Sequence, residues 1–154
     1  MVCEAGFLCT TGACTVDPAS RWNVVLESVT VATTRYDGAQ WDLVGITPDP
    51  YVEVIVGNSA SAPVGTTGSG VDAYTVTFDG GATATDLRAS EIMSFIGFRV
   101  SDDDSPPSAT DDFVGYCGGP PAAEVFASPQ TFECRVDPSA MNSGFTLLWH
   151  LERF

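Results

Sequence analysis

Short segments rich in β-branched and aromatic residues recur along the chain, and loops of glycine, proline and aspartate separate them. Such segments favour extended strands, and about eight of them in a row predict an all-β, antiparallel sandwich. Only residues 85–92 are compatible with a helical turn or two, capped by Thr85 or Asp86. The predicted strands are 22–31, 50–56, 74–78, 93–100 and 144–153, with shorter candidates at 113–117 and 131–136, and a weak edge strand or flexible connection at 57–70.

The composition changes near residue 20. Residues 1–20 are rich in glycine, threonine and cysteine and show no hydrophobic period, whereas the strand pattern begins directly after them. We therefore expect a short Cys-rich N-terminal segment at 1–20 and one sandwich domain at 21–154. The second part is long enough to bury a sizeable core.

The charge balance excludes one large class of partner. The chain has 20 acidic residues and six basic ones, all arginine, for a formal net charge of −14. Nucleic-acid binding requires clustered lysine and arginine to neutralise phosphates, so we expect no nucleic-acid partner. Direct attraction to anionic lipid is disfavoured for the same reason, although a bound cation could still bridge to such a surface.

Five cysteines form two groups, and their polar surroundings favour disulfides over buried thiols. Cys117 and Cys134 are the natural pair, and closing that loop would stabilise the fold by about 3 kcal/mol. Cys3, Cys9 and Cys14 leave one thiol over, so their pairing stays open and a bond to another chain is one explanation. We therefore expect a secreted or cell-surface protein. A zinc site would need a fourth ligand, and His150 lies far away in the sequence.

Aspartates concentrate in two loops, 36–50 and 101–115, and the second loop holds five of them within eleven residues. Carboxylates that close repel one another unless the loop is splayed into water or a cation binds. Ca²⁺ is the expected cation, because it takes about six to eight oxygen ligands in irregular geometry. Asp102 and Asp104 alternate along an extended segment, which places both on one side and Asp103 on the other. A solvated acidic loop without metal is the alternative.

Two motifs resemble those of C2 domains, the calcium-dependent lipid-binding modules. Asp49-Pro50-Tyr51-Val52 resembles the start of a family strand. Val100-Ser101-Asp102-Asp103-Asp104 and Asp112-Phe113-Val114-Gly115 resemble the two sides of the second family loop. Both motifs occur in the family's order, and the resemblance covers about residues 22–154. It implies a C2-like Greek-key sandwich that binds Ca²⁺ through Asp42, Asp49, Asp102, Asp104 and Asp112, with Asp111 as a candidate additional ligand because the second loop is longer than usual.

Some residues depart from the family or leave a choice open. No lysine-rich strand is present, which argues against phosphoinositide binding. The apolar residues of the first loop could form a membrane or partner surface if they are exposed at its tip: Trp41, Leu43, Val44 and Ile46. Trp41 could equally pack beneath the loop as a lid on the core.

We expect no enzymatic activity and no catalytic residues. The chain has one histidine and no Gly-x-Ser-x-Gly motif, and its paired carboxylates sit in one crowded acidic loop. Three functions remain. The first is a Ca²⁺-binding extracellular module for protein–protein or surface assembly, including self-association. The second is a Ca²⁺-dependent phospholipid-binding module, and the third is a structural sandwich without metal. Export would favour the first over the second, because inner-leaflet anionic lipids are not available outside a cell.

Overall fold

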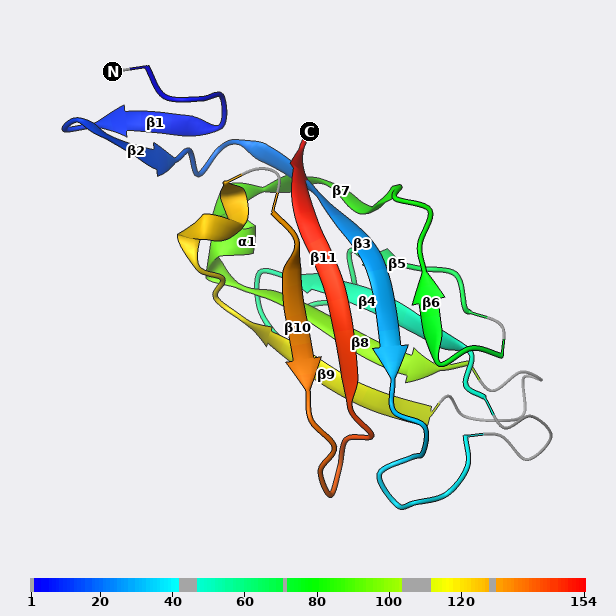
Figure 1. Cartoon of the computed structure of the whole chain (residues 1–154). Helices are drawn as coiled ribbons and strands as arrows, with labels where there is room; N and C mark the ends of the chain where they lie inside the picture. The colour runs from blue at the N-terminus through cyan, green and yellow to red at the C-terminus, as the bar shows by residue number, and fades with distance from the viewer. Residues whose placement is uncertain (1, 42–46, 71, 104–111, 128–129) are drawn as a thin grey trace.

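The computed structural model describes residues 2–41, 47–70, 72–103, 112–127 and 130–154. Two antiparallel sheets face each other, so the predicted all-β sandwich is confirmed (Figure 1). The first sheet has the order β10 (Phe132–Val136), β11 (Phe145–Arg153), β3 (Arg21–Val31) and β6 (Thr75–Thr77), with β7 (Ala82–Arg88) also paired to β3. The second has the order β5 (Gly65–Thr66), β4 (Pro50–Val56), β8 (Ile96–Asp102) and β9 (Asp112–Gly119).

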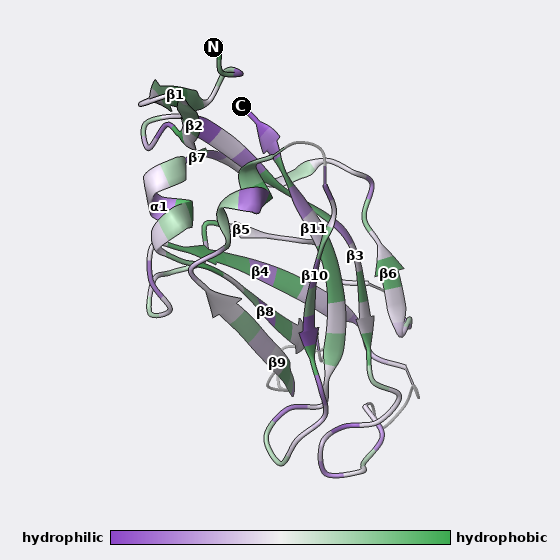
Figure 2. Cartoon of the chain, turned by 60° about the vertical axis from the view of Figure 1, so that its left-hand side comes forward, coloured by the Kyte–Doolittle hydropathy of each residue, from purple (hydrophilic) through white to green (hydrophobic). Residues whose placement is uncertain are grey.

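The core lies between the two sheets, and Figure 2 shows hydrophobic residues along β3, β4 and β11. Aromatic rings join the layers: the ring centroids of Phe98 and Trp149 are 4.9 Å apart. Near the other end of the core, those of Trp22 and Phe126 are 5.2 Å apart, edge to face. These side chains are buried, and burying each stabilises the fold by roughly 1.5–3 kcal/mol before entropy is counted. No helix in the described ranges is long and apolar enough to cross a membrane.

The helical prediction was misplaced. Residues 82–88 form β7, whose register pairs Trp22 with Leu87 and Val24 with Ala84. The helix α1 begins only at Ala89 and ends at Ser94, so the strand predicted to start at residue 93 starts at Ile96 instead. The cap is also different, since the backbone N–H of Arg88 donates to Glu91 Oε2 at 3.0 Å. Strand pairing with β3 overrides the helical preference that the sequence of residues 85–88 indicated.

The Cys-rich segment contains two strands that its sequence did not predict. β1 (Phe7–Thr10) and β2 (Ala13–Val16) form a hairpin whose two central residues, Thr11 and Gly12, both have positive φ. Positive φ at both positions is what a two-residue hairpin turn requires. The hairpin forms its own sheet beyond the end of the sandwich that carries the C-terminus (Figure 1). A short 3₁₀ helix, Ala123–Phe126, lies between β9 and β10.

Candidate metal centre

Three of the proposed Ca²⁺ ligands lie within the described residues, and all three are at the end of the sandwich away from the hairpin. Asp102 is the last residue of β8, and its ladder partners are Pro50 of β4 and Asp112 of β9. Asp49 directly precedes Pro50. The sheet register therefore brings Asp49, Asp102 and Asp112 to adjacent positions. Asp42, Asp104 and Asp111 lie outside the described residues, as do Leu43, Val44 and Ile46.

Asp102 is the most constrained of these carboxylates. It is fully buried, at 0% exposure, in a protein with a large excess of negative charge. The backbone N–H of Asp49 donates to Asp102 Oδ1 at 2.6 Å, and this bond ties the start of β4 to the end of β8. Burying a carboxylate disfavours its charged form unless hydrogen bonds or a cation compensate. Asp102 therefore connects three strands at this end of the fold: its side chain binds the start of β4, and its backbone lies between β4 and β9 in the sheet.

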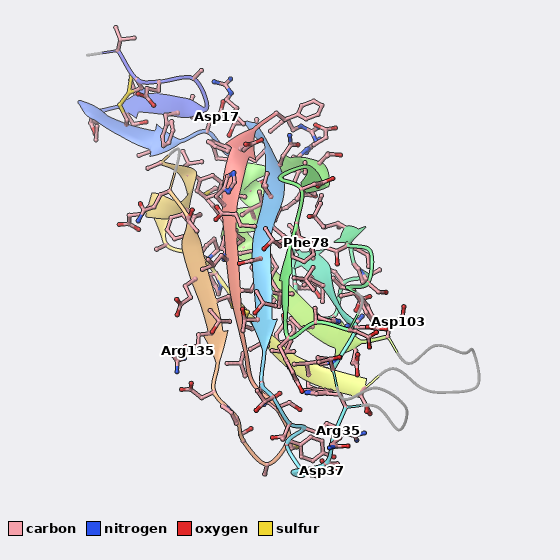
Figure 3. All side chains as sticks on the ribbon, turned by 45° about the vertical axis from the view of Figure 1, so that its right-hand side comes forward. Asp17, Arg35, Asp37, Phe78, Asp103 and Arg135 are labelled. Carbon is pink, nitrogen blue, oxygen red and sulfur yellow. A yellow bond between two sulfur atoms is a disulfide. The ribbon has the colours of Figure 1, made fainter. Side chains whose placement is uncertain are left out.

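Asp103 faces a different direction, as strand alternation predicts. Its Oδ2 accepts a hydrogen bond from the Ser69 hydroxyl at 2.5 Å, while its backbone N–H donates to the carbonyl of Asp49 at 3.1 Å. Figure 3 shows Asp103 at the same end of the molecule as Arg35 and Asp37. Asp103 thus connects the site to the segment before β6 and leaves Asp102 as the inward carboxylate.

Part of that segment, residues 67–70 and 72–73, is a third contributor that the sequence did not reveal. It lies beside the start of β4, where the Gly70 N–H donates to the Pro50 carbonyl at 2.9 Å. The backbone N–H of Asp72 donates to Asp49 Oδ1 at 2.5 Å. Asp72 lies in the small, polar stretch between β5 and β6, and no motif there signals a role beside Asp49. Only the long-range pairing reveals it.

Asp112 carries an internal counter-ion. The guanidinium of Arg35, on the connection between β3 and β4, forms an ion pair with Asp112 Oδ2. Arg35 also lies 3.8 Å from Asp37 Oδ1. Both side chains of the Arg35–Asp112 pair are largely shielded, so solvent screens this pair less than a surface ion pair. An ion that takes Asp112 as a ligand must compete with Arg35.

The described carboxylates do not form a closed metal cage by themselves. Within the part of the chain that the structure describes, the one group of three or more potential ligands whose atoms all lie within 4.8 Å is Cys3, Cys9 and Cys14. One side of the proposed Ca²⁺ site, at the end of the sheet, is formed by Asp49, Asp102 and Asp112. The carboxyl chemistry suits Ca²⁺, and a complete shell would need further oxygens, such as those proposed from Asp42 and Asp104.

Trp41 packs beneath the loop as a lid on the core, which is one of the two placements that the sequence left open, and it lacks the exposure that a partner surface would require. Its side chain is 3% exposed, and its indole N–H donates to the Ala32 carbonyl at 2.9 Å. A tryptophan in this position closes the core below the first aspartate loop. It cannot insert into a bilayer without leaving that place.

A pocket of about 510 Å³ lies beside the acidic end. The Arg35–Asp112 ion pair forms one side, and Tyr36, Phe113 and Met141 contribute apolar surface with 49%, 43% and 75% exposure. The Ser143 hydroxyl accepts a hydrogen bond from the Tyr36 N–H at 3.0 Å, which ties the β3–β4 connection to the segment before β11. An exposed, partly apolar hollow beside charged groups is a common feature of binding surfaces.

His150 takes part in a separate polar contact on the outer face of β11. Its Nδ1 lies 2.8 Å from Glu27 Oε1, and its Nε2 lies 3.4 Å from Glu152 Oε1. The pKa of Glu27 is lowered, chiefly by the hydrogen bond from the Thr131 hydroxyl at 2.7 Å and also by His150. Glu27 stabilises the fold at neutral pH, and this contribution is lost as the pH falls below the carboxyl's ordinary range.

Comparison with known proteins identifies the architecture. No family model and no curated sequence matches the chain. One solved C2 domain superposes with a TM-score of 0.54 and 18% identity, over 86% of this chain and 98% of the other. A C2 domain of plant extended synaptotagmin 1 gives 0.58 and 12%, over 90% of this chain and 98% of the other. This chain has the fold of a C2 domain.

The C2 fold also occurs as one part of larger similar proteins. Human GIVD cytosolic phospholipase A2 superposes with a TM-score of 0.53 and 14% identity, over 90% of this chain but only 18% of the enzyme. At such identities the likeness establishes the architecture, in agreement with the sequence motifs. In that architecture Asp49, Asp102 and Asp112 stand at the strand ends where the motifs predicted them.

Proposed function

We propose that this chain is a Ca²⁺-binding C2 module of an extracellular or cell-surface protein, and that the ion orders its acidic end for contact with a protein partner or a second copy. The observation that carries the proposal is Asp102, a fully buried carboxylate aligned in the sheet between Asp49 and Asp112. Bringing carboxylates together is costly without a cation, and Ca²⁺ offsets that cost while accepting irregular oxygen geometry.

Three features support a protein surface over a lipid bilayer as the partner. Trp41, the largest apolar side chain of the first loop, is buried in the core. The formal charge of −14 also opposes anionic lipid unless bound ions reverse the local sign. The pocket lined by Tyr36, Phe113 and Met141 is suited to a protruding apolar side chain of a protein. Phospholipid binding through Ca²⁺ remains the alternative function.

The proposed role is binding and not catalysis. The two ring nitrogens of the single histidine face Glu27 and Glu152 on an outer sheet face. Asp49, Asp102 and Asp103 accept backbone or hydroxyl hydrogen bonds, which suits fixed ligands better than groups that exchange protons with a substrate.

Calorimetric titration of the intact chain tests the proposal. Ca²⁺ added to protein stripped with chelator should give saturable heat, and Mg²⁺ at equal ionic strength should give much less because it requires stricter octahedral geometry. Sedimentation velocity with and without Ca²⁺ then tests for self-association. Ca²⁺-dependent co-sedimentation with phosphatidylserine vesicles would favour the lipid alternative. If the titration gives no heat and Ca²⁺ leaves thermal stability unchanged, the proposal is wrong.

Replacing Arg35 should strengthen Ca²⁺ binding. In Arg35→Gln the guanidinium no longer competes for Asp112, so we expect a severalfold lower dissociation constant in calorimetry. The matched control is Arg135→Gln, which changes the net charge equally but breaks a contact with the exposed Asp137. If the two substitutions change the dissociation constant equally, Ca²⁺ affinity depends only on the overall charge, and Arg35 does not compete with the ion for Asp112.

A further inference from the structure

The guanidinium of Arg35 holds a carboxylate of its own chain at the side of the 510 Å³ pocket. Both Arg35 and Asp112 line this pocket, and they form an ion pair with each other. A guanidinium carries five N–H donors in a fork that matches a carboxylate. Among the described residues only Asp112 accepts a hydrogen bond from this group, since Asp37 lies 3.8 Å from Arg35 Nε. Asp112 therefore occupies the place that the carboxylate of a ligand would take.

The rest of the pocket lining is mainly apolar and exposed. Tyr36 comes from the β3–β4 connection, Phe113 from the start of β9, and Met141 from the connection between β10 and β11. A bare carboxylate would leave these surfaces in water, whereas a carboxylate on an apolar stem would bury them. The lining thus indicates the chemical class of the ligand, which in a protein partner is an acidic residue beside an apolar side chain.

The backbone that carries Arg35 is fixed by bonds that do not involve Asp112. The N–H and the carbonyl of Arg35 are both hydrogen-bonded within its own turn. The next residue, Tyr36, donates its N–H to the hydroxyl of Ser143, a buried residue whose own N–H donates to the Val114 carbonyl at 2.8 Å. These bonds tie the β3–β4 connection to β9. The pocket is therefore already formed before a ligand arrives, which lowers the entropy cost of binding.

We propose that this pocket binds a carboxylate on an apolar stem, and that Asp112 blocks the site by holding Arg35. Withdrawing Asp112 from the guanidinium opens the site. An ion that takes Asp112 as a ligand would do so, and its charge would offset that of the neighbouring Asp37. This coupling to Ca²⁺ rests on the proposed function, whereas the pocket and its block by Asp112 do not. Where both ligands bind, each strengthens the binding of the other.

NMR titration with phenylacetate in chelator tests the block. Phenylacetate should bind Asp112→Asn at least about fivefold more tightly than the wild type, the lower end of typical coupling between sites. The neutral analogue phenylacetamide should show no such gain. Asp103→Asn removes the same charge outside the pocket and should keep the wild-type affinity. An equal gain in both variants would overturn the proposal, because a diffuse change in charge would then explain the binding.

The wild type in saturating Ca²⁺ gives a second measurement that needs no variant. Phenylacetate should again bind at least about fivefold more tightly than in chelator, and it should tighten Ca²⁺ binding by the same factor. In Arg35→Gln this gain should disappear while Ca²⁺ still binds. A gain that survives in Arg35→Gln would mean that the probe contacts the ion directly, and the role of Arg35 would be wrong.

The two measurements separate this inference from the proposed function. If calorimetry shows no Ca²⁺ binding, the proposed function is wrong, and the chelator titration of Asp112→Asn alone decides whether the pocket takes a carboxylate. If Ca²⁺ binds but phenylacetate gains affinity neither in Asp112→Asn nor in the Ca²⁺-loaded wild type, the pocket proposal fails and the calcium site stands.

Discussion

Millimolar Ca²⁺ should raise the melting temperature of the wild-type chain, and Asp102→Asn should remove most of that increase. A ligand at about 100 times its dissociation constant stabilises the native state by about 2.7 kcal/mol. For a domain of this size each kcal/mol shifts the melting temperature by about 2–4 °C, so an increase of about 5–11 °C is expected. Differential scanning calorimetry in Ca²⁺ and in chelator measures it.

In Asp102→Asn the charge of the side chain is removed while its hydrogen bond is retained, so the substitution tests the charge alone. The asparagine Oδ1 can still accept the N–H of Asp49, so the link between β4 and β8 is retained. The buried negative charge is lost, and with it the anionic ligand that would contact the ion. We therefore expect the metal-free variant to be as stable as the wild type or more so, because one source of carboxylate repulsion has gone.

Asp103→Asn is the matched control. It removes the same charge one residue away, but its side chain faces Ser69 rather than the interior. It should retain most of the Ca²⁺ response. If Asp102→Asn and Asp103→Asn reduce the response equally, the ion is held by diffuse charge and not by a site built on Asp102.

The sequence predicted strands best where local pattern and tertiary environment agree. Residues 50–56 were expected as a strand and form β4 with those bounds. Residues 82–88 show the opposite case, because their partner on β3 lies about sixty positions earlier and no local pattern announces it. Thr11-Gly12 is a third case, in which two positive φ angles create a hairpin inside a segment without hydrophobic period.

The residues of the candidate site also fall into two groups, those that the sequence predicted and those that it did not. Asp49, Asp102 and Asp112 could be proposed from the sequence because each belongs to a short motif attached to a strand, and the sheet register places them at adjacent positions. Arg35, Ser69 and Asp72 were missed because each reaches the site from a different loop through one long-range contact. Such contacts depend on how the two sheets stack, and a linear motif does not contain that information.

Removing the bond between Cys117 and Cys134 should cause a large loss of stability in the sandwich. Cys117 lies on β9 and Cys134 on β10, so the pair joins the two sheets at one edge, with 6.4 Å between the Cα atoms. With a sequence separation of 17, the chain-entropy model gives a contribution of about 3 kcal/mol. We expect Cys117→Ala with Cys134→Ala to lower the melting temperature by about 6–12 °C.

The double replacement is preferable to a single one, because a lone thiol at either position could exchange with the hairpin sulfurs. Both side chains are half-buried against the core, and alanine keeps the site apolar, so packing losses stay small. The comparison is a variant with serine at positions 3, 9 and 14. The hairpin forms a separate sheet, so its cross-link constrains little of the sandwich, and that variant should melt close to the wild type. An equal fall in both variants would mean that hairpin and sandwich unfold as one cooperative unit.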